Sequence, residues 1–230
     1  MDNLIPLSIG MNMVQHIIVL MLPMVLAITV HEAAHGWVAL KFGDKTAAQE
    51  GRLTLNPLKH IDLVGTIILP TLFSILFTGL IFGWAKPVPI DARNFKNPKR
   101  AMMIVALAGP MSNLLMAIGW ALLGWVGVQL YRMEFISVPF ILWSRAGITI
   151  NLALALINML PVPPLDGSRV LSGLLPNYWA WQFNRFERYG LFFLLALFAS
   201  EATGYTSILS YIFDYPKYIA ENLLFSLAGR

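Results

Sequence analysis

The stretch TVHEAAHGWVAL, residues 29–40, carries three ionisable side chains with the spacing of a metal site. His31 and His35 are four positions apart, so in a helix they lie about 40° apart on one face and both imidazoles can reach one ion. Glu32 lies about 100° round from His31, where it is badly placed to bind the same ion but well placed to contact a water molecule beside it. In H-E-x-x-H metallohydrolases the two histidines hold zinc and the glutamate takes the proton of the water. The motif therefore predicts a zinc-dependent hydrolase.

The motif stands at the end of a long segment without formal charge. Residues 3–30 contain no Lys, Arg, Asp or Glu. A solvated surface helix, which is the ordinary explanation for a chance H-E-x-x-H, does not fit these neighbours. A charged group at the bilayer centre costs at least about 2.5–3.5 kcal/mol on insertion scales. Three ionisable groups within five residues need a compensating partner, and a metal ion is the simplest one.

Asp166 is the candidate for a third ligand, because a catalytic zinc takes three protein ligands and keeps one open position. It follows the uncharged run 146–165 in the stretch NMLPVPPLDG, whose three prolines cannot continue a helix. An unwound stretch of this kind can project a carboxylate into the interior of a helix bundle. The alternative is that Asp166 only caps the helix that follows. We predict one zinc ion per chain, held by His31, His35 and Asp166.

Composition places these residues in a membrane protein. Of the 230 residues 57% are hydrophobic and 12% are charged, whereas an ordinary soluble domain is about 25% charged. The apolar windows without charge are 3–30, 63–85, 101–131, 146–165, 189–200 and 202–213. A helix needs about 20 apolar residues to span the hydrocarbon. We therefore expect an all-α polytopic membrane protein with about four to six transmembrane helices. We expect a single domain over 1–230, with a catalytic core at about 11–170 and C-terminal helices at about 186–230.

The cations indicate how the chain is oriented. The net charge is +4, but Lys and Arg lie mostly in short connections between apolar windows, which fits membrane topology and not nucleic-acid binding. The connections 41–63 and 83–100 are both basic, and the positive-inside rule favours the cytoplasm for both. That is possible if 64–82 enters and leaves on one side as a re-entrant segment; the alternative is a plain span with one basic loop outside. On either reading the histidine end of the first helix is expected toward the cytoplasm.

Other polar residues could assist peptide hydrolysis. Asn113 and Asn158 can donate to an oxyanion without adding charge; the alternative for both is a helix–helix hydrogen bond, which we favour for Asn113. Gly109-Pro110 is expected to mark a close helix approach or a kink. The alternation in GRLTLNP predicts a short membrane-associated β segment, which could receive an unwound substrate by β-addition. Its pairing residues would be Arg52, Leu53, Thr54, Leu55 and Asn56.

Three motifs together resemble the site-2 protease family of intramembrane zinc metalloproteases, in order and in spacing. They are HEAAH, AGPMSN (108–113) and NMLPVPPLDG (158–167). The stretches GRLTLNPLKHID and GWAKPVPID are similar to small prokaryotic members, so the resemblance covers about residues 25–170. The sequence departs from many members of this family in having no PDZ insertion and no CBS domain.

The resemblance implies a multi-pass protein of a prokaryotic cell membrane that cuts transmembrane or membrane-proximal segments of other proteins. It implies zinc at His31, His35 and Asp166, with Glu32 as the general base. It also implies that Asn158 assists substrate or transition-state binding. No oligomeric state follows from it.

Two other classes of protein stay open. In a metal transporter the histidines and the aspartate would form a transit site, and further acceptors would lie along a path, whereas the sequence has one cluster. An inactive homologue that binds membrane proteins would be favoured by a lost Glu or His, yet both are present. The Glu32→Gln variant separates these classes from a protease.

Overall fold

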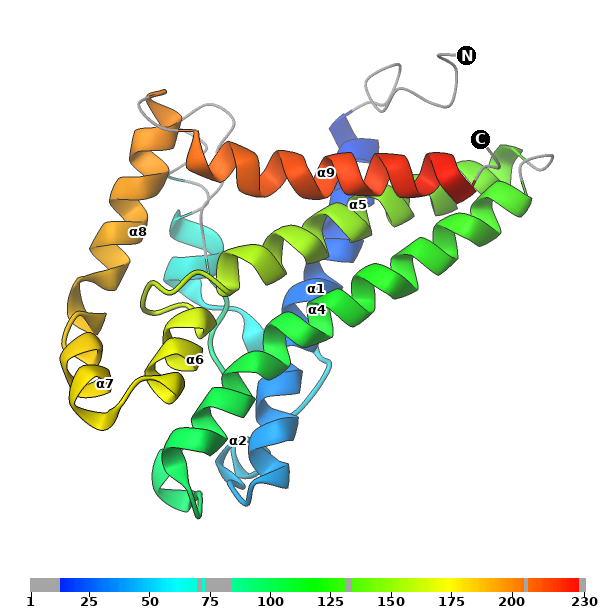
Figure 1. Ribbon diagram of the computed structural model, residues 1–230. Helices are drawn as coiled ribbons and strands as arrows, with labels where there is room; N and C mark the ends of the chain where they lie inside the picture. The colour runs from blue at the N-terminus through cyan, green and yellow to red at the C-terminus, as the bar shows by residue number, and fades with distance from the viewer. Residues whose placement is uncertain (1–12, 70–71, 73–83, 131–133, 205–206, 228–230) are drawn as a thin grey trace.

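The computed structural model describes residues 13–69, 72, 84–130, 134–204 and 207–227, which form helices joined by short connections and contain no β-strand. Figure 1 shows these elements in chain order. They are α1 (Met13–Lys41), α2 (Thr46–Gln49), the 3-10 helix η1 (Pro57–His60), the π-helix η2 (Leu63–Ile68), the 3-10 helix η3 (Ala92–Asn94), α4 (Pro98–Gln129), α5 (Glu134–Asn158), α6 (Asp166–Leu174), α7 (Asn177–Asn184), α8 (Glu187–Ala202) and α9 (Ile208–Leu227).

Three of these helices are long and apolar enough to cross a membrane: Ile18–Lys41 in α1, Pro98–Gln129 (α4) and Val138–Asn158 in α5. A helix satisfies its own backbone hydrogen bonds, which lipid cannot do for it. Large apolar side chains stay exposed on these helices, among them Met21 at 57% and Leu115 at 66%. Exposed apolar faces of this extent are costly in water and suit contact with lipid. An all-helical membrane protein is therefore what the described part of the chain forms.

The two C-terminal windows form helices that fall short of this standard. The helix α8 has 16 residues, fewer than the roughly 20 that span the hydrocarbon. The helix α9 has 20 residues but carries Asp214, Lys217 and Glu221. In Figure 1, α8 stands to one side and α9 lies along α5. The predicted count of four to six spans is not confirmed, since three candidates lie within the described ranges.

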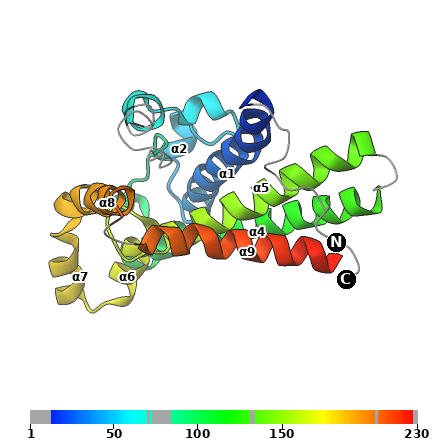
Figure 2. The same ribbon diagram turned by 90° about the horizontal axis from the view of Figure 1, so that it is seen from above.

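The helices α4 and α5 run side by side, and α1 packs against both (Figures 1 and 2). Glycines permit the close approach of α4 and α5. A Cβ at Gly147 would lie 2.3 Å from the indole of Trp120, and a Cβ at Gly127 would lie 3.0 Å from Cβ of Phe140. Helices in lipid associate through such small residues because close packing, and not hydrophobicity, holds them together.

An extended segment, residues 84–91, lies against the C-terminal half of α1; we call it the strap. The N–H of Trp84 donates to the carbonyl oxygen of Gly65 at 3.0 Å, and the N–H of Lys86 donates to that of His60 at 2.9 Å. The chain that leaves η2 therefore returns beside it at Trp84. The predicted re-entrant segment 64–82 otherwise lies mostly outside the described residues.

The predicted β segment at residues 52–56 is not confirmed, because the chain bends there. The N–H of Asn56 donates to Oγ1 of Thr54 at 3.1 Å, and the carbonyl oxygen of Thr54 lies 3.0 Å from Nε2 of His60. A carbonyl that accepts from this buried side chain is not available to a neighbouring strand. The extended segment in this region is the strap, which the sequence predicted as a basic connection and which lies within the family-like stretch GWAKPVPID.

Candidate metal centre

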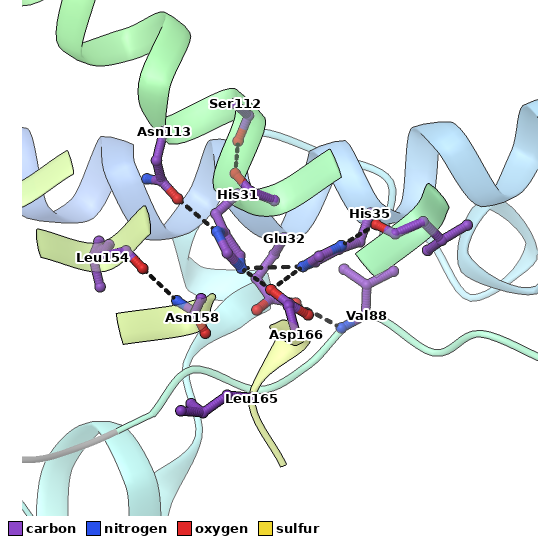
Figure 3. A network of polar contacts seen from close by, with 12 residues as sticks. His31, Glu32, His35, Val88, Ser112, Asn113, Leu154, Asn158, Leu165 and Asp166 are labelled. Atoms are coloured by element: carbon purple, nitrogen blue, oxygen red, sulfur yellow. Dashed lines mark hydrogen bonds and ion pairs between the residues drawn. The ribbon is translucent and has the colours of Figure 1, made fainter. Parts of the chain in front are cut away.

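The structure brings the three predicted metal ligands together in the protein interior (Figure 3). His31 and His35 come from α1, and their Nε2 atoms lie 3.0 Å apart. Asp166, the first residue of α6, places Oδ2 3.1 Å from Nε2 of His31 and 3.2 Å from Nε2 of His35. All three residues are buried. Two helices that are far apart in the sequence thus aim three donor atoms at one point.

The arrangement of the donor atoms suits zinc. Nδ1 of His35 lies 2.7 Å from the carbonyl oxygen of Val105, which can only accept, so the proton is on Nδ1 and Nε2 carries a lone pair. Oδ2 of Asp166 is buried and, among the described residues, has no polar partner apart from the two Nε2 atoms. Acceptor atoms this close repel one another unless a cation lies between them. Bonds of about 2.0–2.2 Å around a tetrahedral zinc place its ligands about 3.3 Å apart, close to the separations observed.

Gly109 of α4 leaves the space in which the imidazoles meet. A Cβ at this position would lie 2.5 Å from Nε2 of His35 and 2.6 Å from Nε2 of His31. The expectation that Gly109-Pro110 marks a close helix approach is confirmed, and the approach is to the imidazoles themselves.

The proline-containing stretch presents Asp166 at the start of α6. Leu165 has extended backbone (φ −66°, ψ 155°) and occupies the N-cap position, so Asp166 is not the capping residue. A Cβ at Gly167 would lie 2.3 Å from the carbonyl oxygen of Met159. The start of α6 therefore passes directly against the chain that follows α5, and this contact fixes the position of the Asp166 carboxylate.

The strap holds Glu32 on the neighbouring face of α1. Oε2 of Glu32 accepts a hydrogen bond from the N–H of Val88 at 2.9 Å (Figure 3). The strap is held in turn by the buried Arg52, whose Nη2 donates to the carbonyl oxygens of Lys86 at 2.9 Å and Pro87 at 3.3 Å. Arg52, predicted to contact substrate, therefore lies against the strap and supports it.

Asp44 ties the far end of the strap to the end of α1. Its buried carboxylate accepts from the N–H of Asp91 at 2.8 Å, from the N–H of Thr46 at 3.0 Å and from Nδ2 of Asn94 at 2.7 Å. Burial alone raises the pKa of the Asp44 carboxyl, but hydrogen bonds from Thr46, Asn94 and Asp91 together lower this pKa below its ordinary value. The sequence analysis missed this role, for which an aspartate in a polar connection gives no local signal.

The two amides predicted to assist catalysis differ in their surroundings. Asn113 is fully buried; its Oδ1 lies 2.6 Å from Nδ1 of His31, and its Nδ2 donates to Oδ1 of Asn151 at 2.9 Å. This amide is occupied on both sides, which fits a positioning role and leaves nothing for substrate. Asn158, at the end of α5, donates to the carbonyl oxygen of Leu154 at 3.0 Å; its contact with substrate stays a prediction. Asn151 was not predicted from the sequence, although an asparagine in the uncharged window 146–165 was a usable signal.

The fold and the site define a helical membrane protein with a candidate metal site of two histidines and one aspartate. Among curated proteins, "Putative zinc metalloprotease YwhC" of Bacillus subtilis (strain 168) is 42% identical over 194 residues, which cover 81% of this chain and 82% of that protein. The chain belongs to the site-2 protease family of zinc metalloproteases.

More distant relatives carry a similar name. "Putative zinc metalloprotease Rip2" of Mycolicibacterium smegmatis is 31% identical over 64% of this chain and 53% of that protein. Rip2 of Mycobacterium tuberculosis (strain H37Rv) is 27% identical over 82% of this chain and 70% of that protein. No model of a protein family and no solved structure matches the chain.

Proposed function

We propose that the chain is an intramembrane zinc endopeptidase that hydrolyses peptide bonds in or near transmembrane segments of other membrane proteins. The observation that carries the proposal is the convergence of His31 and His35, on the apolar helix α1, with Asp166 of α6. Glu32 lies next to His31 on the same helix. The curated relatives, which are named as zinc metalloproteases, support the same class of enzyme.

The three buried ligands would hold one zinc ion and leave a fourth position open. When bound in such a site, zinc lowers the pKa of a water molecule to about 7 and polarises a carbonyl group. Glu32 is not one of the three clustered ligands; its carboxylate is oriented by the N–H of Val88, which uses one of its two oxygens. The second oxygen is able to accept the proton of the attacking water and to pass it to the leaving amine. Glu32 is therefore proposed as the general base.

We propose that this site faces the cytoplasm. The basic connections 41–63 and 83–100 are hydrogen-bonded to each other, through Asp44 with Asp91 and through His60 with Lys86. Two connections that contact each other lie on the same side of a bilayer. This supports a re-entrant segment at 64–82 over a full span, which would place the two basic connections on opposite sides. The positive-inside rule then favours the cytoplasmic side for both.

The loop 52–56 is proposed as a contact for the unwound substrate, because Leu55 and Asn56 are exposed and Arg52 joins the loop to the strap. The Thr54→Pro variant changes the backbone of this bend without touching the zinc ligands. We expect slower cleavage with an unchanged zinc content, and an unchanged cleavage rate would refute the contact.

The Glu32→Gln variant tests the proposed function, in purified protein reconstituted with a reporter transmembrane peptide. We expect cleavage to vanish while bound zinc stays near one per chain, because glutamine keeps the shape of the side chain but cannot take a proton. Glu50→Gln, an exposed residue beyond α2, is the matched control and should cleave normally. Cleavage by Glu32→Gln would overturn the mechanism. Zinc transport across the liposome membrane without any peptide cleavage would favour the transporter.

A further inference from the structure

Asn113 and Asn151 link His31 to the backbone of α5 through a buried chain of hydrogen bonds. Nδ2 of Asn151 donates to the carbonyl oxygen of Gly147 at 2.8 Å. Oδ1 of Asn151 accepts from Nδ2 of Asn113 at 2.9 Å, and Oδ1 of Asn113 lies 2.6 Å from Nδ1 of His31. Both asparagines have 0% exposure. The chain therefore runs from a fixed carbonyl group to a metal ligand without contact with solvent.

The carbonyl group at the far end decides the direction of every hydrogen bond in this chain. A backbone oxygen can only accept, so Asn151 must turn its NH₂ group to Gly147 and its oxygen to Asn113. Asn113 must then turn its NH₂ group to Asn151 and its oxygen to His31. A second contact favours the same orientation, because Nδ2 of Asn113 also lies 3.4 Å from the carbonyl oxygen of Ala27. The only proton that fits the last link is one on Nδ1 of His31.

We propose that Asn151 is a positioning residue that acts through Asn113 to hold the His31 proton on Nδ1 and to keep Nε2 free for the metal ion. The proposal rests on the zinc site of the proposed function. His35 offers an internal comparison, since its Nδ1 faces the carbonyl oxygen of Val105 directly at 2.7 Å. One ligand is oriented by the backbone itself, and the other is oriented by two side chains that can be changed.

A purely structural role for the asparagine pair predicts something different. Hydrogen bonds between membrane helices contribute modestly to helix association, and a pair of that kind would affect the stability of the α4–α5 contact without changing zinc affinity. Groups that orient a metal-binding histidine typically change metal affinity by about 10–100-fold when removed. Zinc affinity therefore distinguishes the two roles.

The test measures the zinc dissociation constant of the full-length protein in detergent by competition with a chelator. Asn151→Ala should weaken zinc binding about tenfold, since Asn113 can then turn its NH₂ group to His31. Ser144→Ala is the matched control on the same helix, because Ser144 is also fully buried and its Oγ has no hydrogen-bond partner within the described part of the chain. We expect the control to bind zinc as the unaltered chain does.

A rescue experiment tests the direction of the hydrogen bonds. Aspartate at position 113 offers an oxygen to His31 whichever way it turns, so it does not need Asn151. The double variant Asn113→Asp with Asn151→Ala should therefore bind zinc about as tightly as Asn113→Asp alone. Equal affinity of Asn151→Ala and Ser144→Ala, or no rescue in the double variant, would overturn the proposal.

Two measures keep the result independent of folding and of protease activity. Asn151→Leu fills the volume that alanine leaves and should weaken zinc binding in the same way if Asn151→Ala does not fold. The rise in melting temperature on adding zinc is measured for each variant against its own zinc-free form, so a general loss of stability does not count as weaker zinc binding. If no peptide is ever cut but the affinities follow this pattern, the protease proposal fails and the role of Asn151 stands.

Discussion

The N–H of Val88 donates to Oε2 of Glu32 across 2.9 Å, and this bond joins residues that are 56 positions apart in the sequence. Pro87 and Pro89 flank Val88 and have no N–H. Within Pro87–Pro89, Val88 is thus the residue whose backbone N–H can donate to Glu32, the proposed general base. The bond ties the orientation of Glu32 to the position of the strap.

Replacing Val88 by proline should slow cleavage without removing zinc. The variant keeps an extended backbone between two prolines but deletes the N–H that orients Glu32. A hydrogen bond to a charged group contributes about 1.5–3 kcal/mol, so we expect kcat to fall by about tenfold or more. Val88→Ala keeps the N–H and controls for the lost side chain; it should fall by much less. Equal rates for the two variants would show that this bond does not orient Glu32.

Gly109→Ala should empty the metal centre. The added methyl group would lie 2.5 Å from Nε2 of His35 and 2.6 Å from Nε2 of His31, so the imidazoles must turn away. We expect the zinc content, measured by elemental analysis of purified protein, to fall far below one per chain.

Gly119→Ala is the control for this change on the same helix. Apart from its chain neighbours and the backbone of its own helix, a Cβ at Gly119 would meet no atom of another described residue within 4 Å. The variant should keep its zinc, with a small gain in stability because alanine favours the helix by about 1 kcal/mol. Full zinc occupancy in Gly109→Ala would contradict the observed contact.

The sequence was sufficient for features that depend on local spacing. Uncharged length predicted the helices α1 and α4 and the second half of α5, and the period of a helix put His31 and His35 on one face. The strap was not predictable in this way, because its hydrogen bonds join Trp84 to Gly65 and Lys86 to His60 across the chain. The alternation at 51–57 predicted a strand that the structure does not form, since no partner strand is present among the described residues.

The orientation of His31 shows the same limit. For its partner Asn113 the sequence favoured a helix–helix hydrogen bond, but the direction of the Asn113 amide depends on Asn151 and Gly147. These two residues lie on a different helix, so their contact with Asn113 follows from no local pattern.

Acid should loosen the connection between the strap and the end of α1. Asp44 has a pKa below its ordinary value, which is about 3.8, because it accepts hydrogen bonds from Thr46, Asn94 and Asp91. The folded state therefore favours the ionised form, and this stabilisation is fully present above about pH 4. It is lost as the pH falls through the lowered pKa.

The Asp44→Asn variant measures this contribution. The NH₂ group of the new side chain would face the N–H and NH₂ donors from which the Asp44 carboxylate now accepts. We expect the melting temperature at pH 7 to fall by several degrees, since each kcal/mol of lost stability lowers it by about 2–4 °C. The difference from the unaltered chain should shrink toward pH 3. Glu50→Gln, in the same connection but exposed, should show no such difference. A gap between the two curves that stays constant with pH would exclude an electrostatic origin.

Gly167→Ala should move Asp166 away from the imidazoles. The added methyl group would lie 2.3 Å from the carbonyl oxygen of Met159 and 2.5 Å from that of Leu160. These are backbone atoms and cannot rotate aside as a flexible side chain can, so the start of α6 must shift and carry the carboxylate with it. We expect zinc affinity to fall by about tenfold or more, since a metal ligand is displaced. Leu174→Ala, at the exposed far end of α6, should leave zinc affinity unchanged. Unaltered zinc binding in Gly167→Ala would mean that the contact with the end of α5 does not fix the third ligand.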